Sequence, residues 1–160
     1  MSDDAVFPEF VKDLLAVEDK RRETLEARGA SVITVSGTLV TLLVALGAFV
    51  PNRQGFVLPD TTRAPLSVAV IAFVVAALLG IATYVPQRVR LTDPNALAEL
   101  LPGYWPKGRE FALKKVTATR LEQLTVLQKG NDWKARALLA AVVGQVVAVG
   151  ALAWAVLVIL

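Results

Sequence analysis

Three long stretches without a charged residue interrupt an otherwise charged chain of 160 residues. They run from Ala30 to Val50, from Ala64 to Gln87 and from Ala137 to Leu160. A helix rises about 1.5 Å per residue, so roughly 20 apolar residues cross a hydrocarbon core about 30 Å thick. Each stretch reaches that length. The pattern predicts an all-α integral membrane protein with three transmembrane helices.

The charged and turn-rich sequences between these stretches give the expected boundaries. The segments of this single membrane domain (1–160) are, in order, a cytosolic helix 9–29, a span 30–50, an external loop 51–64, a span 65–86, a cytosolic helical region 87–133 and a span 134–160. Residues 130–132, Gly-Asn-Asp, predict a kink or an interruption between the last helix of the cytosolic region and the third span.

Two of the charged segments also carry an apolar stripe at the three- and four-residue spacing of one helix face. The stripe of the N-terminal helix contains Phe10, Leu14, Val17 and Leu25. The stripe of a second helix, expected over 109–129, contains Leu113, Val116, Leu121, Leu124 and Leu127. We expect these two stripes to pair. The alternative for the N-terminal helix is the membrane surface or a partner subunit.

Each span carries small residues four positions apart, which form a ridge that permits close approach of another helix. These candidates for packing between copies are Gly37, Thr41 and Ala45 in the first span, Ala72, Ala76 and Gly80 in the second, and Ala140, Gly144 and Ala148 in the third. A three-span subunit has limited surface on which to hide three ridges internally. We therefore expect a homo-oligomer.

Few polar side chains lie inside the expected spans. The candidates for pore lining or for contacts between helices are Ser36, Thr38, Thr41 and Gln145. Because a hydroxyl in a membrane helix can bond to a carbonyl of its own helix, packing and pore lining both remain open for the first span. Gln145 either bonds across an oligomer interface or meets a hydroxyl of the same chain.

Basic residues favour one orientation of the chain. The 51–64 loop contains only Arg53 and Arg63, whereas the N-terminal segment and the 87–136 region are rich in lysine and arginine. The candidates for the membrane edge are Lys20, Arg21, Arg22, Arg28, Lys134 and Arg136. By the positive-inside rule, we expect the N-terminus in the cytoplasm and the C-terminus outside the bacterial inner (plasma) membrane.

Composition disfavours an enzyme. The chain is 55% hydrophobic and has neither cysteine nor histidine, so the commonest general base, the commonest metal ligand and thiolate ligands are missing. The GxxxxGK[ST], GxGxxG, HExxH and GxSxG motifs are absent. We expect no catalytic residue, no metal site and no cofactor. Anionic lipid accounts for the basic segments, which disfavours nucleic acid as a partner.

Two sequence patterns support a resemblance. The first span contains E-x-R-G-x-x-x-I-T-x-S-G-T-L-V-T, and the third is approached through K-G-N-D-W-K-A-R. With the three-span layout, this chain resembles small multi-pass membrane proteins of actinobacteria. It is more loosely similar to the SLATT and Pycsar-type transmembrane effector domains of antiphage systems, whose acid-then-basic approach to each span is approximated here by Asp19-Lys20 and Lys134-Ala135.

The resemblance implies an oligomeric effector that perturbs the inner membrane or forms a pore in it. The lipid bilayer and further copies of the chain are the expected partners, and a cytosolic signalling partner would supply the trigger. A non-catalytic scaffold, whose helices at 9–28 and 109–129 bind another protein, is the alternative.

Overall fold

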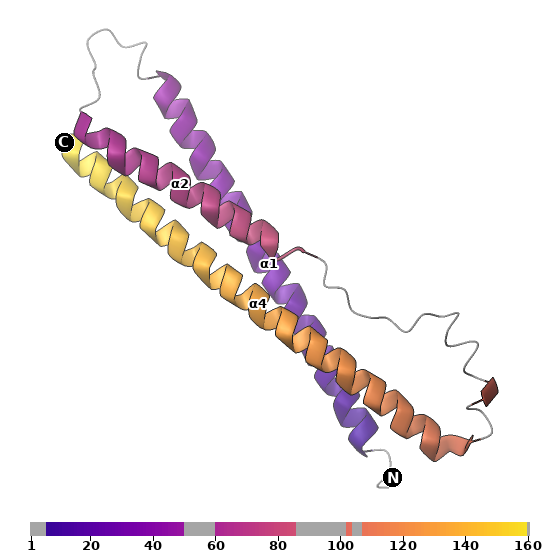
Figure 1. Ribbon diagram of the computed structural model, residues 1–160. Coiled ribbons are helices and arrows are strands. Elements are labelled where there is room, and N and C mark those ends of the chain that lie inside the picture. The colour runs from indigo at the N-terminus through magenta and orange to yellow at the C-terminus, as the bar shows by residue number, and fades with distance from the viewer. Residues whose placement is uncertain (1–5, 50–59, 86–101, 104–106, 160) are drawn as a thin grey trace. The chain divides into compact units, whose positions relative to one another are not determined.

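The computed structural model of the chain is all-helical in the part that it describes, which comprises residues 6–49, 60–85, 102–103 and 107–159 (Figure 1). Its three long helices are α1 (Val6–Phe49), α2 (Asp60–Ala82) and α4 (Gly108–Ile159). Each contains a segment long and apolar enough to cross a membrane. The expected all-α class is therefore confirmed. The expected loop over 51–59 and the start of the cytosolic region, 87–101, lie outside the described residues.

The helix α4 continues through residues 130–132, where the sequence predicted a kink or an interruption. That prediction of an interruption is wrong. A glycine inside a helix costs only about 1 kcal/mol relative to alanine, which a tertiary contact can offset. Such a contact is present, because the Asn131 side chain bonds to Glu18 of α1. At the other end, α4 begins at Gly108, whose φ of +82° is accessible to glycine at little cost.

The helix α2 begins at Asp60, inside the segment expected to be a loop up to residue 64. The sequence Pro59-Asp60 is typical of a turn, but an acidic residue in the first turn also stabilises a helix N-terminus. Asp60 additionally pairs with Arg63, one turn later, at 3.3 Å. The helix ends at Ala82 and closes with backbone bonds from Thr83 to Gly80 and from Tyr84 to Ile81.

The chain divides into two compact units, each of which takes part of α1 and part of α4. The charged unit comprises Met1–Thr24 with Pro86–Trp133, and the apolar unit comprises Leu25–Val85 with Lys134–Leu160.

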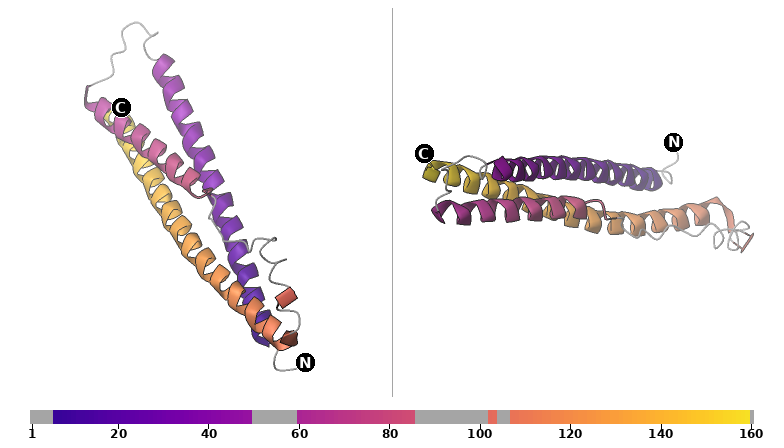
Figure 2. Two further views of the ribbon diagram at one scale, coloured as in Figure 1. Left: turned by 45° about the vertical axis from the view of Figure 1, so that its right-hand side comes forward. Right: turned by 90° about the horizontal axis from the view of Figure 1, so that it is seen from above.

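In the charged unit, the beginning of α1 packs against the beginning of α4 (Figures 1 and 2). Val11 of α1 and Leu124 and Leu127 of α4 are buried there. The two helices run parallel, because Phe7 shares a groove with Leu113, and Glu18 farther along α1 meets Asn131 farther along α4. The two helices pair as expected, but not through the whole of either predicted stripe. Phe10 and Val17 of α1 and Val116 and Leu121 of α4 are exposed.

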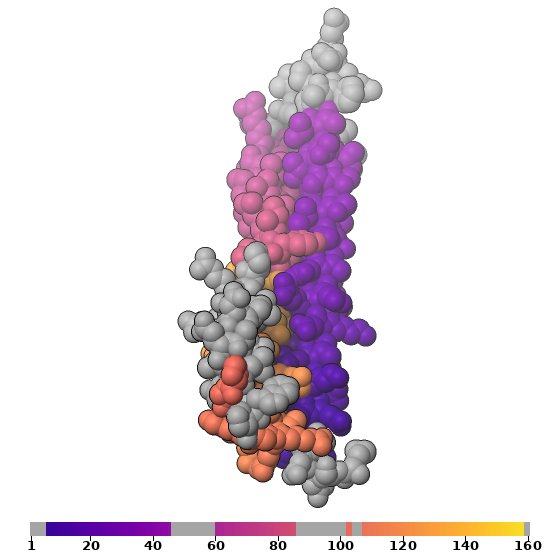
Figure 3. Space-filling model, turned by 90° about the vertical axis from the view of Figure 1, so that its right-hand side faces the viewer, coloured from indigo at the N-terminus to yellow at the C-terminus, as the bar shows by residue number. Residues whose placement is uncertain are grey.

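In the apolar unit, three helical segments surround a small core. Its members are Leu25 and Val32 of α1, Ala76 of α2, and Leu138 and Ala141 of α4. Here α1 and α4 are also parallel, since Glu26 contacts Lys134 and Ser36 contacts Gln145. The helix α2 runs the opposite way and lies directly beside α1 (Figure 3).

Burial along α1 and α4 follows a repeat of alternating three- and four-residue steps. On α4 the buried or half-buried positions of this repeat are Leu124, Leu127, Asn131, Lys134, Leu138, Ala141, Gln145, Ala148, Leu152 and Ala155. On α1 they are Pro8, Val11, Leu15, Glu18, Arg22, Leu25, Gly29, Val32, Ser36, Leu39 and Leu43. A mean step of 3.5 residues is the signature of knobs-into-holes packing between long helices.

Gly29 of α1 and Gly80 of α2 allow their backbones to touch. A Cβ added to Gly29 would overlap the Thr83 hydroxyl and stand 3.2 Å from the Gly80 carbonyl oxygen. A Cβ on Gly80 would stand 3.2 Å from the Gly29 carbonyl oxygen. Gly37, by contrast, has no atom within 4 Å of the position of an added Cβ.

We predict that the free energy of unfolding of Gly29→Ala is about 1–3 kcal/mol lower than that of Gly37→Ala, the usual cost of overpacking a close contact. The measurement is a denaturing-detergent titration of the purified protein in mixed micelles, followed by circular dichroism.

Gly37→Ala is the matched control on the same helix. Both substitutions gain about 1 kcal/mol of helix propensity, but only Gly29→Ala meets α2. A stability of Gly29→Ala equal to that of Gly37→Ala would contradict the close α1–α2 contact.

Candidate functional site

A lysine is fully enclosed in the apolar unit. Lys134 is 0% exposed, and its Nζ lies 2.7 Å from Oε1 of Glu26 on α1, whose side chain is 28% exposed. Leu25 and Leu138, neighbours of this pair along α1 and α4, belong to the unit's core. A buried ammonium without a counter-charge is very costly, so the Glu26 carboxylate is what makes this position tolerable for lysine.

A second polar contact joins α1 and α4 farther along the apolar unit. Nε2 of Gln145 donates to Oγ of Ser36 at 2.9 Å and to the carbonyl oxygen of Val32 at 3.2 Å. Ser36 is completely buried. Of the two alternatives that the sequence left open for Gln145, the structure shows contact with a hydroxyl of the same chain.

In the charged unit, a group of four polar side chains joins the same two helices. The buried Asn131 donates through Nδ2 to the backbone oxygen and to the carboxylate of Glu18, at 2.9 and 2.8 Å. Arg21 pairs with Asp132 at 2.9 Å and with Glu18 at 3.5 Å. Oδ1 of Asn131 and Oγ1 of Thr117 are buried without a hydrogen-bond partner in the described part of the chain.

One exposed face of α1 carries hydroxyl groups. Ser31, Thr34, Thr38 and Thr41, which we call the hydroxyl face, follow alternating three- and four-residue steps and are all exposed. Each donates to the carbonyl four residues earlier, at 2.8–3.4 Å. Their hydrogens are therefore satisfied within α1, as is common for hydroxyls in apolar helices. Gly37 and Ala45, also exposed, extend this small-residue surface.

The small-residue ridges differ in how the chain uses them. Ala76, Gly80 and Ala148 are buried within the chain, and Gly144 lies against Ala72 and Ala76 of α2. Gly80 lies against Gly29, Val32 and Ile33 of α1, so contacts within the chain already occupy part of these ridges. Packing of the ridges between copies stays a prediction. The exposed candidates are Gly37, Thr41, Ala45 and Ala140.

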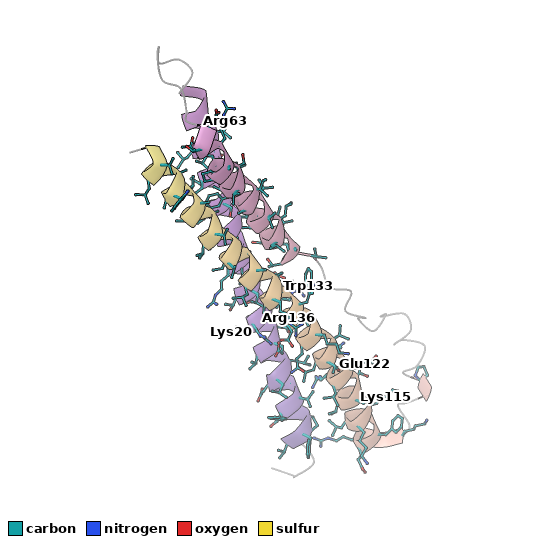
Figure 4. The ribbon with its side chains drawn as sticks, turned by 60° about the vertical axis from the view of Figure 1, so that its left-hand side comes forward. Lys20, Arg63, Lys115, Glu122, Trp133 and Arg136 are labelled. Atoms are coloured by element: carbon teal, nitrogen blue, oxygen red, sulfur yellow. The ribbon has the colours of Figure 1, made fainter. Side chains whose placement is uncertain are left out.

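The basic candidates for a membrane edge also fall into two groups. Lys20, Arg28 and Arg136 are exposed, and Lys20 and Arg136 are labelled in Figure 4. Arg21 is engaged by two carboxylates, and Arg22 is half-buried. Lys134 is enclosed with Glu26, so this side chain does not point outward, and its position at the membrane edge stays a prediction.

A groove of about 520 Å³ lies in the charged unit between the first turns of α1 and α4. Phe7, Leu113 and Leu121 form apolar walls, and the exposed Glu110–Lys114 pair lies at 2.7 Å on its border. The hydrogen bond and the charge of Lys114 lower the pKa of Glu110. Among the described residues, no cluster of His, Cys, Asp or Glu could hold a metal ion.

Sequence reasoning missed the Glu26–Lys134 pair and the function of Ser36 as a partner of Gln145. The signal was present in the three- and four-residue repeat of α4, because Asn131, Lys134 and Gln145 fall on the same stripe as Leu124, Leu138 and Ala141. Polar residues on an otherwise apolar stripe predict polar partners on the facing helix.

Comparison of the chain with known proteins gave no match, whether to a family model, to a curated protein or to a solved structure.

We predict an asymmetry between the two halves of the buried pair. Glu26→Leu leaves the enclosed Lys134 ammonium without its carboxylate and should lower the free energy of unfolding by about 3–5 kcal/mol. Lys134→Met removes the buried charge and leaves a carboxylate with partial access to solvent, so its cost should be about 1 kcal/mol. The same detergent titration measures both.

Two controls match these substitutions. Glu23→Leu and Arg136→Met remove an exposed charge from α1 and from α4, and each should change stability by less than about 0.5 kcal/mol. Equal costs for Glu26→Leu and Lys134→Met would show that Lys134 is not enclosed as described.

Proposed function

We propose that this chain is an oligomeric effector of the bacterial inner membrane, which perturbs the bilayer or forms a pore in it when a partner or signal acts on its charged unit. A place in antiphage defence follows from its resemblance to SLATT and Pycsar-type domains. The observation that carries the proposal is the exposed hydroxyl face of α1, which lies on an apolar helix and offers small, polar contacts to another copy.

The membrane arrangement in this proposal has three spans. The parallel course of α1 and α4 and the opposite course of α2 in the apolar unit support it, because an up-down-up path requires these directions. The excess of basic residues in the N-terminal segment and in the 87–136 region supports a cytosolic position for the charged unit and an external C-terminus.

Contacts within the chain reduce the number of polar side chains that are candidates for lining a pore. Ser36 is completely buried and accepts a hydrogen bond from Gln145, so its hydroxyl oxygen is already used within the chain. The side chains of Thr34, Thr38 and Thr41 are exposed, and their oxygen lone pairs remain available to water or to a neighbouring helix. We therefore assign the conduit, or the contact between copies, to α1.

A second candidate function is a membrane scaffold that binds another protein. The groove in the charged unit favours it, because apolar walls beside an ion pair suit an amphipathic helix. Recovery of one stoichiometric partner from the native membrane, with no ion leak from liposomes containing the chain, would favour the scaffold over the effector.

We predict that native mass spectrometry of the chain in nanodiscs gives a discrete oligomer, and that over-expression depolarises the cells. Gly37→Leu places a bulky side chain on the hydroxyl face and should shift the particle to the monomer and restore the membrane potential. A voltage-sensitive dye reports the potential.

Gly150→Leu is the matched control, because Gly150 is equally exposed and has no atom within 4 Å of an added Cβ, but lies on α4. It should leave both the oligomer and the depolarisation unchanged. A monomeric wild-type particle together with an unaltered membrane potential would overturn the effector proposal.

A further inference from the structure

The two polar contacts of the apolar unit share one geometry. Each joins a position of the α4 repeat to α1, and each lies in the same parallel register. Lys134 is separated from Glu26 by 108 positions and Gln145 from Ser36 by 109. Val32 and Ala141, one turn before Ser36 and Gln145, are members of the core that lies between these two contacts.

We propose that Glu26, Ser36, Lys134 and Gln145 fix the register of α1 against α4 in the apolar unit. The apolar residues of the repeat cannot do this alone. Their stripe repeats every seven residues, so a slip of one heptad brings apolar positions opposite apolar positions again. The polar positions break this equivalence, as a single buried polar residue does in coiled coils.

A slip of seven residues in either direction leaves polar groups unpaired. Moving α1 one way replaces Glu26 (26 + 7) by Ile33 opposite Lys134, and Ser36 (36 + 7) by Leu43 opposite Gln145. Moving it the other way brings Asp19 to Lys134 but Gly29, which has no side chain, to Gln145. Only the observed register gives the ammonium a carboxylate and the amide a hydroxyl acceptor together.

The surroundings of these contacts explain why an unpaired group there would not be tolerated. Lys134 and Ser36 have no exposed surface, so water cannot replace a lost partner. In an apolar segment every polar group must be satisfied by the protein itself. The four residues therefore act as positioning residues, independent of whether the chain forms a pore.

Disulfide trapping in the full-length chain tests the proposal, since the natural sequence has no cysteine. The pair Val32→Cys with Ala141→Cys reports the observed register. The pair Leu39→Cys with Ala141→Cys reports a slip of one heptad (32 + 7). Each pair is placed in the natural background and in an apolar background carrying Glu26→Leu, Ser36→Ala, Lys134→Met and Gln145→Leu. The disulfide is read by mass spectrometry of the digested monomer band after oxidation in nanodiscs.

We expect only the 32–141 disulfide in the natural background and both disulfides in the apolar background. Formation of the 32–141 disulfide alone in both backgrounds would overturn the proposal, because the register would then be fixed without these four residues.

If the apolar background yields neither disulfide, exchanging the charges of Glu26 and Lys134 tests the proposal instead. Glu26→Lys and Lys134→Glu should each reduce the 32–141 disulfide, and the double exchange should restore it. The proposal fails if the double exchange yields no more of this disulfide than the single variants, or if the single variants form it as well as the natural chain does. Neither result depends on oligomer formation or on membrane depolarisation.

Discussion

The cost of leaving a polar group unpaired in an apolar surrounding is the constraint on which the apolar unit depends. An ammonium is tolerated there because the Glu26 carboxylate lies 2.7 Å from Lys134, and an amide is tolerated because Ser36 and the Val32 carbonyl accept its hydrogens. Both contacts join the same two helices. The buried polar groups that would cost the most free energy if unpaired therefore specify that α1 packs against α4, and in which register.

Small residues satisfy the second requirement of this unit, which is close approach. Gly29 and Gly80 bring the α1 and α2 backbones into contact, and Gly144 lies against Ala72 and Ala76. Because lipid is as apolar as leucine, helix association in a membrane depends on such fit and on hydrogen bonds rather than on burial of apolar surface. Gly37 and its hydroxyl neighbours are exposed, so they are distinct from the surfaces of α1 that pack within the chain.

The sequence was sufficient to predict the helical class. A charge-free stretch long enough to cross a membrane has few alternatives to a helix, because a helix satisfies its own backbone hydrogen bonds. It was also sufficient for the pairing of the 9–29 and 109–129 helices, but not for the contact face of α1, where Val11 is buried and Phe10 and Val17 are exposed. It failed at residues 130–132, where local propensity indicated a break and a contact with Glu18, 113 positions away, supports the helix. The partners of Lys134 and Gln145 are similarly distant in the sequence, at separations of 108 and 109 residues. No local sequence pattern identifies which residues they are.

The two units differ in how completely their polar atoms are satisfied. In the apolar unit, the buried Lys134, Ser36 and Thr83 all have partners. In the described part of the charged unit, Asn131 Oδ1 and Thr117 Oγ1 are buried without one. An unsatisfied buried acceptor or donor costs about 1–3 kcal/mol, so these are the two atoms of the described charged unit at which a further hydrogen bond would add stability.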